Sequence, residues 1–225
     1  MPTPFQLHAF DVYLFDIDGT LLNTRDLVHY NSLNRAMLEV YGVDTTIDGI
    51  RYHGKTDLGI LRATMERAGL VGSAFDSRLQ QALEVVRREV GANAAALRPE
   101  ICAGIPELVQ TLYASGKLLG VASGNLEVVG WHKIAATGLR EYFSFGYFSD
   151  QCEMRAAVFQ NAVAEARRRA GQGARICFIG DTPDDILAAR SAGAQVIAVG
   201  TGIFQTTELS CHDPDLCVAS CAELI

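Results

Sequence analysis

The stretch Tyr13–Asn23, "YLFDIDGTLLN", ends an apolar run in two aspartates one residue apart, followed at once by glycine and threonine. Residues 12–15 have the composition of a buried strand. A carboxylate at the end of such a strand is costly unless a cation compensates its charge, and two neighbouring carboxylates repel each other. Asp16 and Asp18 therefore indicate a site that needs a positively charged partner.

The rest of the chain alternates apolar strand patterns with helical ones. Further strands are expected at residues 117–123, 174–181 and 194–200, and another near a sheet edge at 143–149. The intervening helices are expected at residues 104–115, 126–137, 153–170 and 183–192. Continuous apolar strands that alternate with helices are typical of an α/β fold whose parallel sheet is covered on both faces.

Residues 23–99 interrupt this alternation. They contain no convincing strand and show helical periods at 27–41, 57–68 and 74–90. Residues 91–100 have the composition of a linker that returns to the sheet. We therefore predict a parallel-sheet core formed by residues 1–22 and 100–225, and a helical insertion formed by residues 23–99.

Composition excludes several classes of protein. The chain has 225 residues, is 49% hydrophobic and carries a net charge of -7, with no stripe rich in lysine and arginine, which argues against nucleic-acid binding. The one basic cluster, at residues 165–175, is expected at a helix C-terminus. Six cysteines without a C-x-x-C pair argue against a zinc site and a disulfide framework. No signal-peptide pattern and no membrane-spanning run is visible, so we expect a cytoplasmic protein without a membrane partner.

Polar side chains follow three predicted strands where each strand ends. These are Asp16 with Asp18, then Ser123, then Asp181. In open parallel sheets, ligands bind outside the carboxyl ends of the strands. Ser123 and Asp181 also precede helices, where either residue would be a good N-cap. Capping does not explain Asp16 and Asp18, and the whole set indicates a site.

The residue types specify a chemistry. Carboxylate oxygens are the hard ligands that Mg²⁺ prefers, and the metal would neutralise the paired aspartates. One carboxylate can attack phosphorus to form an aspartyl-phosphate, and a second can act as general acid and then as general base. Phosphate oxygens are expected to bind the Ser123 hydroxyl and the backbone N–H groups around Gly19, Thr20, Gly124 and Asn125.

Three motifs carry a family resemblance. "DIDGT" (16–20), "VASGN" (121–125) and "IGDTPDDI" (179–186) resemble motifs one, two and four of the haloacid dehalogenase superfamily. The segments 138–150 and 188–202 are similar to its phosphoglycolate phosphatase-like subgroup. The resemblance covers nearly the whole chain. It implies a Rossmann-like core with a helical cap inserted just after the first motif.

The resemblance also implies roles for individual residues. Asp16 would be the nucleophile and a Mg²⁺ ligand, and Asp18 would be the general acid and base, with its backbone carbonyl on the metal. Asp181 would be the third protein ligand, Asp185 would support the metal's water shell, and Ser123 would bind the phosphoryl group. In this superfamily, true dehalogenases usually lack a carboxylate at the second position and do not use Mg²⁺. Asp18 therefore favours phosphoryl chemistry.

One motif of the family is missing. Its third motif is a lysine between motifs two and four, whereas the lysines here are Lys55, Lys117 and Lys133. Lys117 lies at the wrong end of its strand, and we interpret Lys133 as a surface residue of the following helix. Arg155 opens the next helix in about the right place, so we predict that Arg155 fills the catalytic role. The simpler alternative is a solvated arginine in a helix's first turn.

The insertion contains one further polar segment, "RYHGKTDLGI" (51–60). A cap in this family closes over the core and excludes water. His53 and Lys55 flank Gly54 there, and Lys55 either contacts the leaving group or belongs to a solvated turn. Both explanations stay open.

Three functions are compatible with these observations. The leading hypothesis is a Mg²⁺-dependent phosphatase that hydrolyses a small phosphorylated metabolite, as a monomer or a homodimer. A sugar-phosphate mutase would share the core and the cap. The third possibility is a non-catalytic binding protein that kept the fold, which the missing lysine favours and the intact aspartates disfavour.

Overall fold

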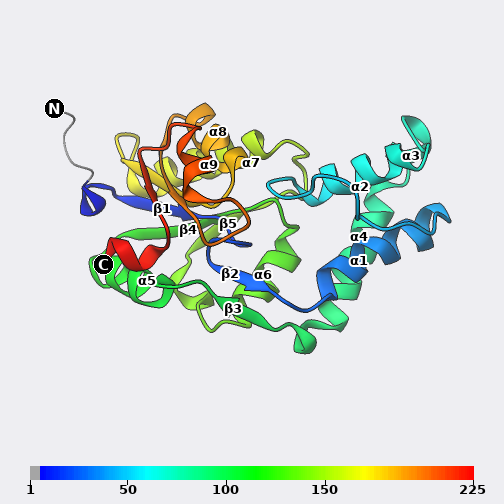
Figure 1. Ribbon diagram of the computed structural model, residues 1–225, viewed down its shortest axis with the longest axis horizontal. Helices are drawn as coiled ribbons and strands as arrows, with labels where there is room; N and C mark the ends of the chain where they lie inside the picture. Colours follow the sequence, from blue (N-terminus) through cyan, green and yellow to red (C-terminus); the bar gives the residue numbers. More distant parts are fainter. Residues whose placement is uncertain (1–5) are drawn as a thin grey trace.

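Strand β1 (Val12–Phe15) lies inside a six-stranded parallel sheet in the computed structural model, which describes residues 6–225 (Figure 1). The strand order is β5-β4-β1-β6-β7-β8. The other five strands are β4 (Leu118–Ala122), β5 (Phe145–Tyr147), β6 (Ile176–Gly180), β7 (Gln195–Val199) and β8 (Leu216–Val218). The chain runs from β1 outward to β4 and β5 and then crosses to β6, so the strand order reverses beside β1. Ligand sites of open α/β sheets lie at such a reversal.

Helices cover both faces of this sheet. They are α5 (Ile105–Ala114), α6 (Glu127–Ala135), α7 (Arg155–Ala170), α8 (Pro183–Ser191) and α9 (Thr206–Ser210). The side chains of β1 alternate between two cores, as the period of a strand requires. Tyr13 and Phe15 pack with α5 and α6, whereas Val12 and Leu14 pack with α7, α8 and α9. All four are fully buried, which is why this strand is a continuous apolar run.

The insertion is helical, as the sequence predicts, and has a hydrophobic core of its own. Its elements are α1 (Val28–Ala36), a π-helical turn (Met37–Tyr41), α2 (Asp57–Arg67), α3 (Ser73–Asp76) and α4 (Leu79–Ala92). The chain enters it through β2 (Leu22–Thr24) and returns through β3 (Pro99–Ile101), and these two strands pair antiparallel. The insertion therefore leaves the core through a two-stranded connection, at one end of the molecule in Figure 1.

The α/β fold is confirmed, and so are its long elements. The sequence missed β2, β3, β8 and α9, which have only three to five residues and show no readable period. Within residues 6–225, four short 3₁₀ helices complete the fold: Leu7–Ala9, Ala94–Ala96, Arg140–Tyr142 and Cys221–Leu224. The edge position expected for the strand at 143–149 is also found, since β5 ends the strand order.

Three expectations from composition can be compared with the structure. The basic cluster lies in the last turn of α7, where Arg168 and Arg169 both pair with Glu165. All six cysteines are free. Within residues 6–225, no helix is both long and apolar enough to cross a bilayer.

The insertion is docked against the core by hydrogen bonds near the start of α2. The Asp57 N–H donates to the Gly124 carbonyl at 2.8 Å, and the Leu126 N–H donates to the Asp57 carboxylate at 2.8 Å. The Thr56 hydroxyl donates to the Glu153 carbonyl at 2.6 Å. The structure therefore shows the insertion closed over the carboxyl ends of β1 and β4.

Substitution of two glycines by alanine would distinguish the energetic cost of a positive φ from the cost of a steric clash. Gly104 and Gly116 both have a positive φ, at 80° and 72°. A Cβ on Gly104 would lie 2.1 Å from the backbone nitrogen of Ala222, whereas a Cβ on Gly116 would meet nothing within 4 Å. We expect Gly116→Ala to lower the free energy of unfolding by about 1 kcal/mol. Gly104→Ala should cost at least about 2 kcal/mol more, because backbone atoms must move. Urea unfolding measures both values, and equal costs would contradict this packing.

Candidate active site

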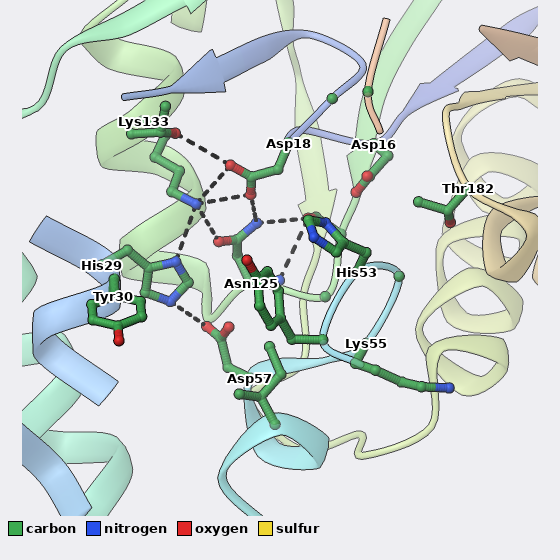
Figure 2. Close-up of a pocket in the computed structure, with 18 of the residues that line it drawn as sticks. Asp16, Asp18, His29, Tyr30, His53, Lys55, Asp57, Asn125, Lys133 and Thr182 are labelled. Atoms are coloured by element: carbon green, nitrogen blue, oxygen red, sulfur yellow. Dashed lines mark hydrogen bonds and ion pairs between the residues drawn. The ribbon is translucent and has the colours of Figure 1, made fainter. Parts of the chain in front are cut away.

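Asp16 lies at the carboxyl end of β1, at a cavity of about 360 Å³ between the core and the insertion (Figure 2). Its Oδ1 is buried and accepts no hydrogen bond of good geometry. Burial raises the pKa of Asp16 to about 7, with Arg155 opposing that shift and Asp185 adding to it. A raised pKa of this kind means that the positive charge near the Asp16 carboxylate does not compensate for its burial.

Asp16 belongs to a cluster of three buried carboxylates. Oxygens of Asp16, Asp181 and Asp185 lie within 4.8 Å of one another. Burial also raises the pKa of Asp181 well above its ordinary value, and the neighbouring Asp185 and Asp16 raise it further. The three carboxylates offer hard oxygen donors at a spacing that suits a metal ion, and the ion would supply the positive charge that the cluster lacks.

The Asp181 carboxylate is held in a tight cradle. The Thr20 hydroxyl donates to its Oδ1 at 3.0 Å. A Cβ on Gly19 would lie 2.2 Å from Asp181 Oδ2, and a Cβ on Gly202 would lie 1.8 Å from the same atom. Only residues without a side chain fit at these two positions, so they fix where the carboxylate points.

Helix α8 is capped by a residue other than Asp181. The Thr182 hydroxyl accepts from the Asp185 N–H, and the Asp185 carboxylate accepts from the Thr182 N–H in return. Because this capping box satisfies the first turn of α8, capping does not account for Asp181. Helix α6 likewise has Leu126 at its N-cap, so Ser123 is not its cap either.

Both carboxylate oxygens of Asp185 are already engaged. Its Oδ1 accepts from the Arg155 Nε at 2.9 Å, and its Oδ2 accepts from the Thr182 hydroxyl at 2.7 Å. These bonds leave Asp185 better suited to orient its neighbours than to bind a metal directly.

Arg155 is the first residue of α7, and its guanidinium bridges the carboxylates. Its Nη2 lies 2.9 Å from Asp16 Oδ1, and its side chain is only 9% exposed. Its Nη1 donates to the Gly54 carbonyl in the insertion at 3.3 Å. The alternative of a solvated arginine in a first turn is excluded by this burial.

The interpretation of Lys133 as a surface residue is wrong, because its side chain is 3% exposed. The Lys133 Nζ donates to Asp18 Oδ2 at 2.8 Å and to Asn125 Oδ1 at 2.9 Å. A signal for this was present in the sequence. Lys133 lies four residues after Val129 and three after Gly130, on the buried stripe of α6.

Lys133 and Asn125 together orient the Asp18 carboxylate (Figure 2). The Asn125 side-chain amide donates to Asp18 Oδ2 at 2.8 Å. Although burial alone would raise it, the pKa of Asp18 is lowered by the Lys133 ammonium and the Asn125 amide. The Asp18 carboxylate therefore faces Lys133 and lies outside the cluster of carboxylates around Asp16. The family resemblance places the backbone carbonyl of Asp18, and not its carboxylate, on the metal.

Two residues of the insertion extend this contact, and the sequence reasoning missed both. His29 Nδ1 lies 3.1 Å from the Lys133 Nζ, so this nitrogen is the acceptor. His29 Nε2 lies 3.2 Å from Asp57 Oδ2. The insertion thus contacts the cation that holds Asp18.

The residues predicted to bind phosphate differ in whether their hydrogen-bond donors are already used within the protein. The N–H groups of Gly19 and Thr20 each donate to a carbonyl within the same loop. The Asn125 amide donates to Asp18 and to the Ser123 hydroxyl. Ser123 and Gly124 line the cavity, whereas Thr20 does not and holds Asp181 instead.

His53 and Lys55, which flank Gly54 in segment 51–60, have distinct environments. Burial lowers the pKa of His53, which favours its neutral form. The Lys55 Nζ lies 3.3 Å from Asp184 Oδ2, and its side chain runs away from Asp16 in Figure 2.

Comparison with known proteins identifies the family. Residues 13–199 match the sequence profile described as "Haloacid dehalogenase-like hydrolase". The chain belongs to this family. A phosphoglycolate phosphatase of Synechococcus elongatus is 27% identical, and the match covers 94% of both proteins. The pyrophosphatase PpaX of Anoxybacillus flavithermus is 26% identical with the same coverage.

Solved structures share the fold of this hydrolase. The crystal structure of CbbY from Rhodobacter sphaeroides in complex with phosphate superposes with a TM-score of 0.71. The two sequences are 20% identical, and the match covers 96% of each chain.

The glycine cradle around Asp181 predicts a selective loss of metal binding. Gly202→Ala would place a methyl group on the Asp181 carboxylate and displace it. We expect at least roughly tenfold weaker Mg²⁺ binding by calorimetry, the lower end of what lost outer contacts cost a metal site. Gly200→Ala is the matched control, because its Cβ would lie 3.0 Å from the Thr206 methyl group and 3.5 Å from the Ala219 carbonyl, and none of its nearest atoms belongs to Asp181. Equal Mg²⁺ affinity in both variants would contradict the assignment of Asp181.

Proposed function

We propose that this hydrolase is a Mg²⁺-dependent phosphatase that cleaves a small phosphomonoester through an aspartyl-phosphate on Asp16. The observation that supports this most is the Asp16 carboxylate itself. It is buried at the carboxyl end of β1, has an oxygen without a good hydrogen bond, and faces a cavity large enough for a small metabolite. Curated relatives named as phosphatases and pyrophosphatases agree with this reaction. We expect the reaction to take place in the cytoplasm.

Asp16, Asp181 and the backbone carbonyl of Asp18 would hold the metal, and Asp185 would support it by fixing Arg155. When bound, Mg²⁺ supplies positive charge that neutralises the carboxylates and the phosphate oxygens. The Ser123 hydroxyl and the Gly124 N–H would bind the phosphate oxygens on the opposite side.

The reaction has two balanced steps. In the first, an Asp16 oxygen attacks phosphorus, the bond from phosphorus to the ester oxygen breaks, and the leaving oxygen takes a proton from Asp18. Asp18 has to carry a proton for this step, even though Lys133 and Asn125 lower its pKa. In the second, water attacks the aspartyl-phosphate, Asp18 takes a proton from that water, and inorganic phosphate leaves. Asp18 thus acts first as general acid and then as general base.

Arg155 and Lys133 divide the work of the family's single lysine. Arg155 neutralises Asp16 and provides guanidinium donors beside the phosphate position, where a fork suits phosphate oxygens. Lys133 holds Asp18 in one orientation and acts as a positioning residue. Phosphoryl transfer relies mainly on such positioning and electrostatic stabilisation.

A phosphatase screen tests the proposed reaction directly. With Mg²⁺, the protein should release inorganic phosphate from at least one small phosphomonoester, and EDTA should abolish the release. Ca²⁺ should support it poorly, because its larger and looser coordination misplaces the nucleophile. Asp16→Asn should also abolish it, since an amide cannot form the phosphoenzyme. Phosphate transfer to a sugar without release would favour a mutase, and full turnover in EDTA would refute the metal requirement.

The role of Lys133 predicts an effect on the second step. Lys133→Met removes the cation that holds Asp18, so the attack of water on the phosphoenzyme should slow. We expect phosphate release to fall by about 10²-fold, the lower end of what acid–base catalysis contributes. Lys117→Met is the matched control, because the exposed Lys117 Nζ donates only to the His8 carbonyl.

Rapid-quench measurements locate the affected step. With an activated aryl phosphate, whose leaving group needs no proton, Lys133→Met should keep its burst of product and accumulate phosphoenzyme. A uniform loss of both phases, or the same loss in Lys117→Met, would contradict the positioning role.

A further inference from the structure

Part of the insertion side of the active-site cavity is an apolar wall. Leu33, Ile47 and Ile60 line it and are buried. The rings of Tyr30 and Tyr52 line it as well. The Tyr30 hydroxyl is already used, because it donates to Asp48 at 2.6 Å. This wall therefore offers apolar and aromatic surface to whatever part of the substrate lies beyond the phosphate.

Two exposed apolar residues continue this surface to the rim of the cavity. Leu27 comes from the start of the insertion and is 60% exposed, and Ile203 comes from the core and is 55% exposed. A single exposed leucine or isoleucine needs no explanation. Leu27 and Ile203, however, line the same cavity from the insertion and from the core. Together they extend the apolar surface from the cavity wall to solvent.

Among the described residues, every lysine and arginine that lines this cavity already has a carboxylate partner. Its lining contains Lys55, Lys133 and Arg155, and each is paired with a carboxylate of the protein itself. Asp26 and Asp57 also line the cavity on the insertion side and add negative charge. A leaving group with a carboxylate or a second phosphate would lose its hydration there without gaining an unpaired cation.

We propose that the substrate is a phosphomonoester of an uncharged, largely apolar alcohol, whose hydrocarbon or ring contacts Tyr30, Tyr52 and Leu27. This inference rests on the proposed phosphatase function and adds the chemical class of the leaving group. It sets this chain apart from an enzyme built for phosphoglycolate or pyrophosphate, whose leaving groups are anionic.

Three synthetic substrates test the leaving group. Phosphoglycolate and 2-hydroxyethyl phosphate have similar size and differ in one carboxylate, and 2-phenylethyl phosphate adds an apolar ring. With Mg²⁺, kcat/KM should rise in the order phosphoglycolate, 2-hydroxyethyl phosphate, 2-phenylethyl phosphate. Each step should be about tenfold or more, the range that small changes in a buried contact produce.

A substitution at the rim should shift this preference. Leu27→Arg adds a cation to the cavity without removing buried packing, so it should raise the ratio of kcat/KM for phosphoglycolate over 2-phenylethyl phosphate by about tenfold. Leu187→Arg is the matched control, because Leu187 is 57% exposed on α8 and lies outside the cavity. It should leave the ratio unchanged. No change in Leu27→Arg, or an equal change in both variants, would overturn the assignment of this wall.

The failure of this inference differs from the failure of the proposed function. If the wild-type protein prefers phosphoglycolate, the apolar assignment is overturned. Loss of that preference in Lys55→Met would then show that Lys55 leaves Asp184 to bind the carboxylate. If none of the three compounds yields phosphate but another phosphomonoester of the screen does, the inference is overturned and the phosphatase function stands. If no phosphomonoester yields phosphate with Mg²⁺ present, the proposed function fails and the inference fails with it.

Discussion

The structure depends on a cluster of carboxylates buried at the carboxyl ends of β1 and β6. Asp16, Asp181 and Asp185 lie within 4.8 Å of one another with little access to water. Such a cluster is unfavourable unless positive charge compensates it. The surrounding chain is shaped by this requirement. Gly19 and Gly202 leave room for the Asp181 carboxylate, the capping box of α8 fixes Asp185, and α7 begins with the arginine that bridges Asp185 to Asp16.

Two separate side chains supply positive charge to the active-site aspartates of this protein. Arg155 pairs with Asp16, and Lys133 pairs with Asp18. Each cation also contacts the insertion, Arg155 through the Gly54 carbonyl and Lys133 through His29. The closed position of the insertion is thereby linked to the geometry of both aspartates. A lid that completes a catalytic site on closure is a common device, because it excludes water only when the catalytic groups are aligned.

Much of the fold was predictable from sequence, because its long strands are continuous apolar runs and its long helices start at recognisable positions. Asp16, Asp18 and Asp181 were predicted to share a site because they follow strands at the same end of the sheet, where parallel topology brings side chains together, and all three line one cavity. Lys133 was missed because a lysine in a helix is usually solvated, although its spacing from Val129 and Gly130 places it on the buried stripe of α6. His29 and Asp57 were missed for a deeper reason: their partners lie in the core, and the docking of the insertion depends on contacts between segments far apart in sequence.

The covalent intermediate on Asp16 is the central claim, and peptide mapping of acid-quenched protein tests it most directly. Protein mixed with Mg²⁺ and a phosphomonoester that it hydrolyses is quenched in acid and digested, and its peptides are weighed by mass spectrometry. We predict one added phosphoryl group on the peptide that carries Asp16, and none when Asp16→Asn is treated in the same way. Steady release of phosphate without any labelled peptide, or with the label on a peptide that lacks Asp16, would contradict this account.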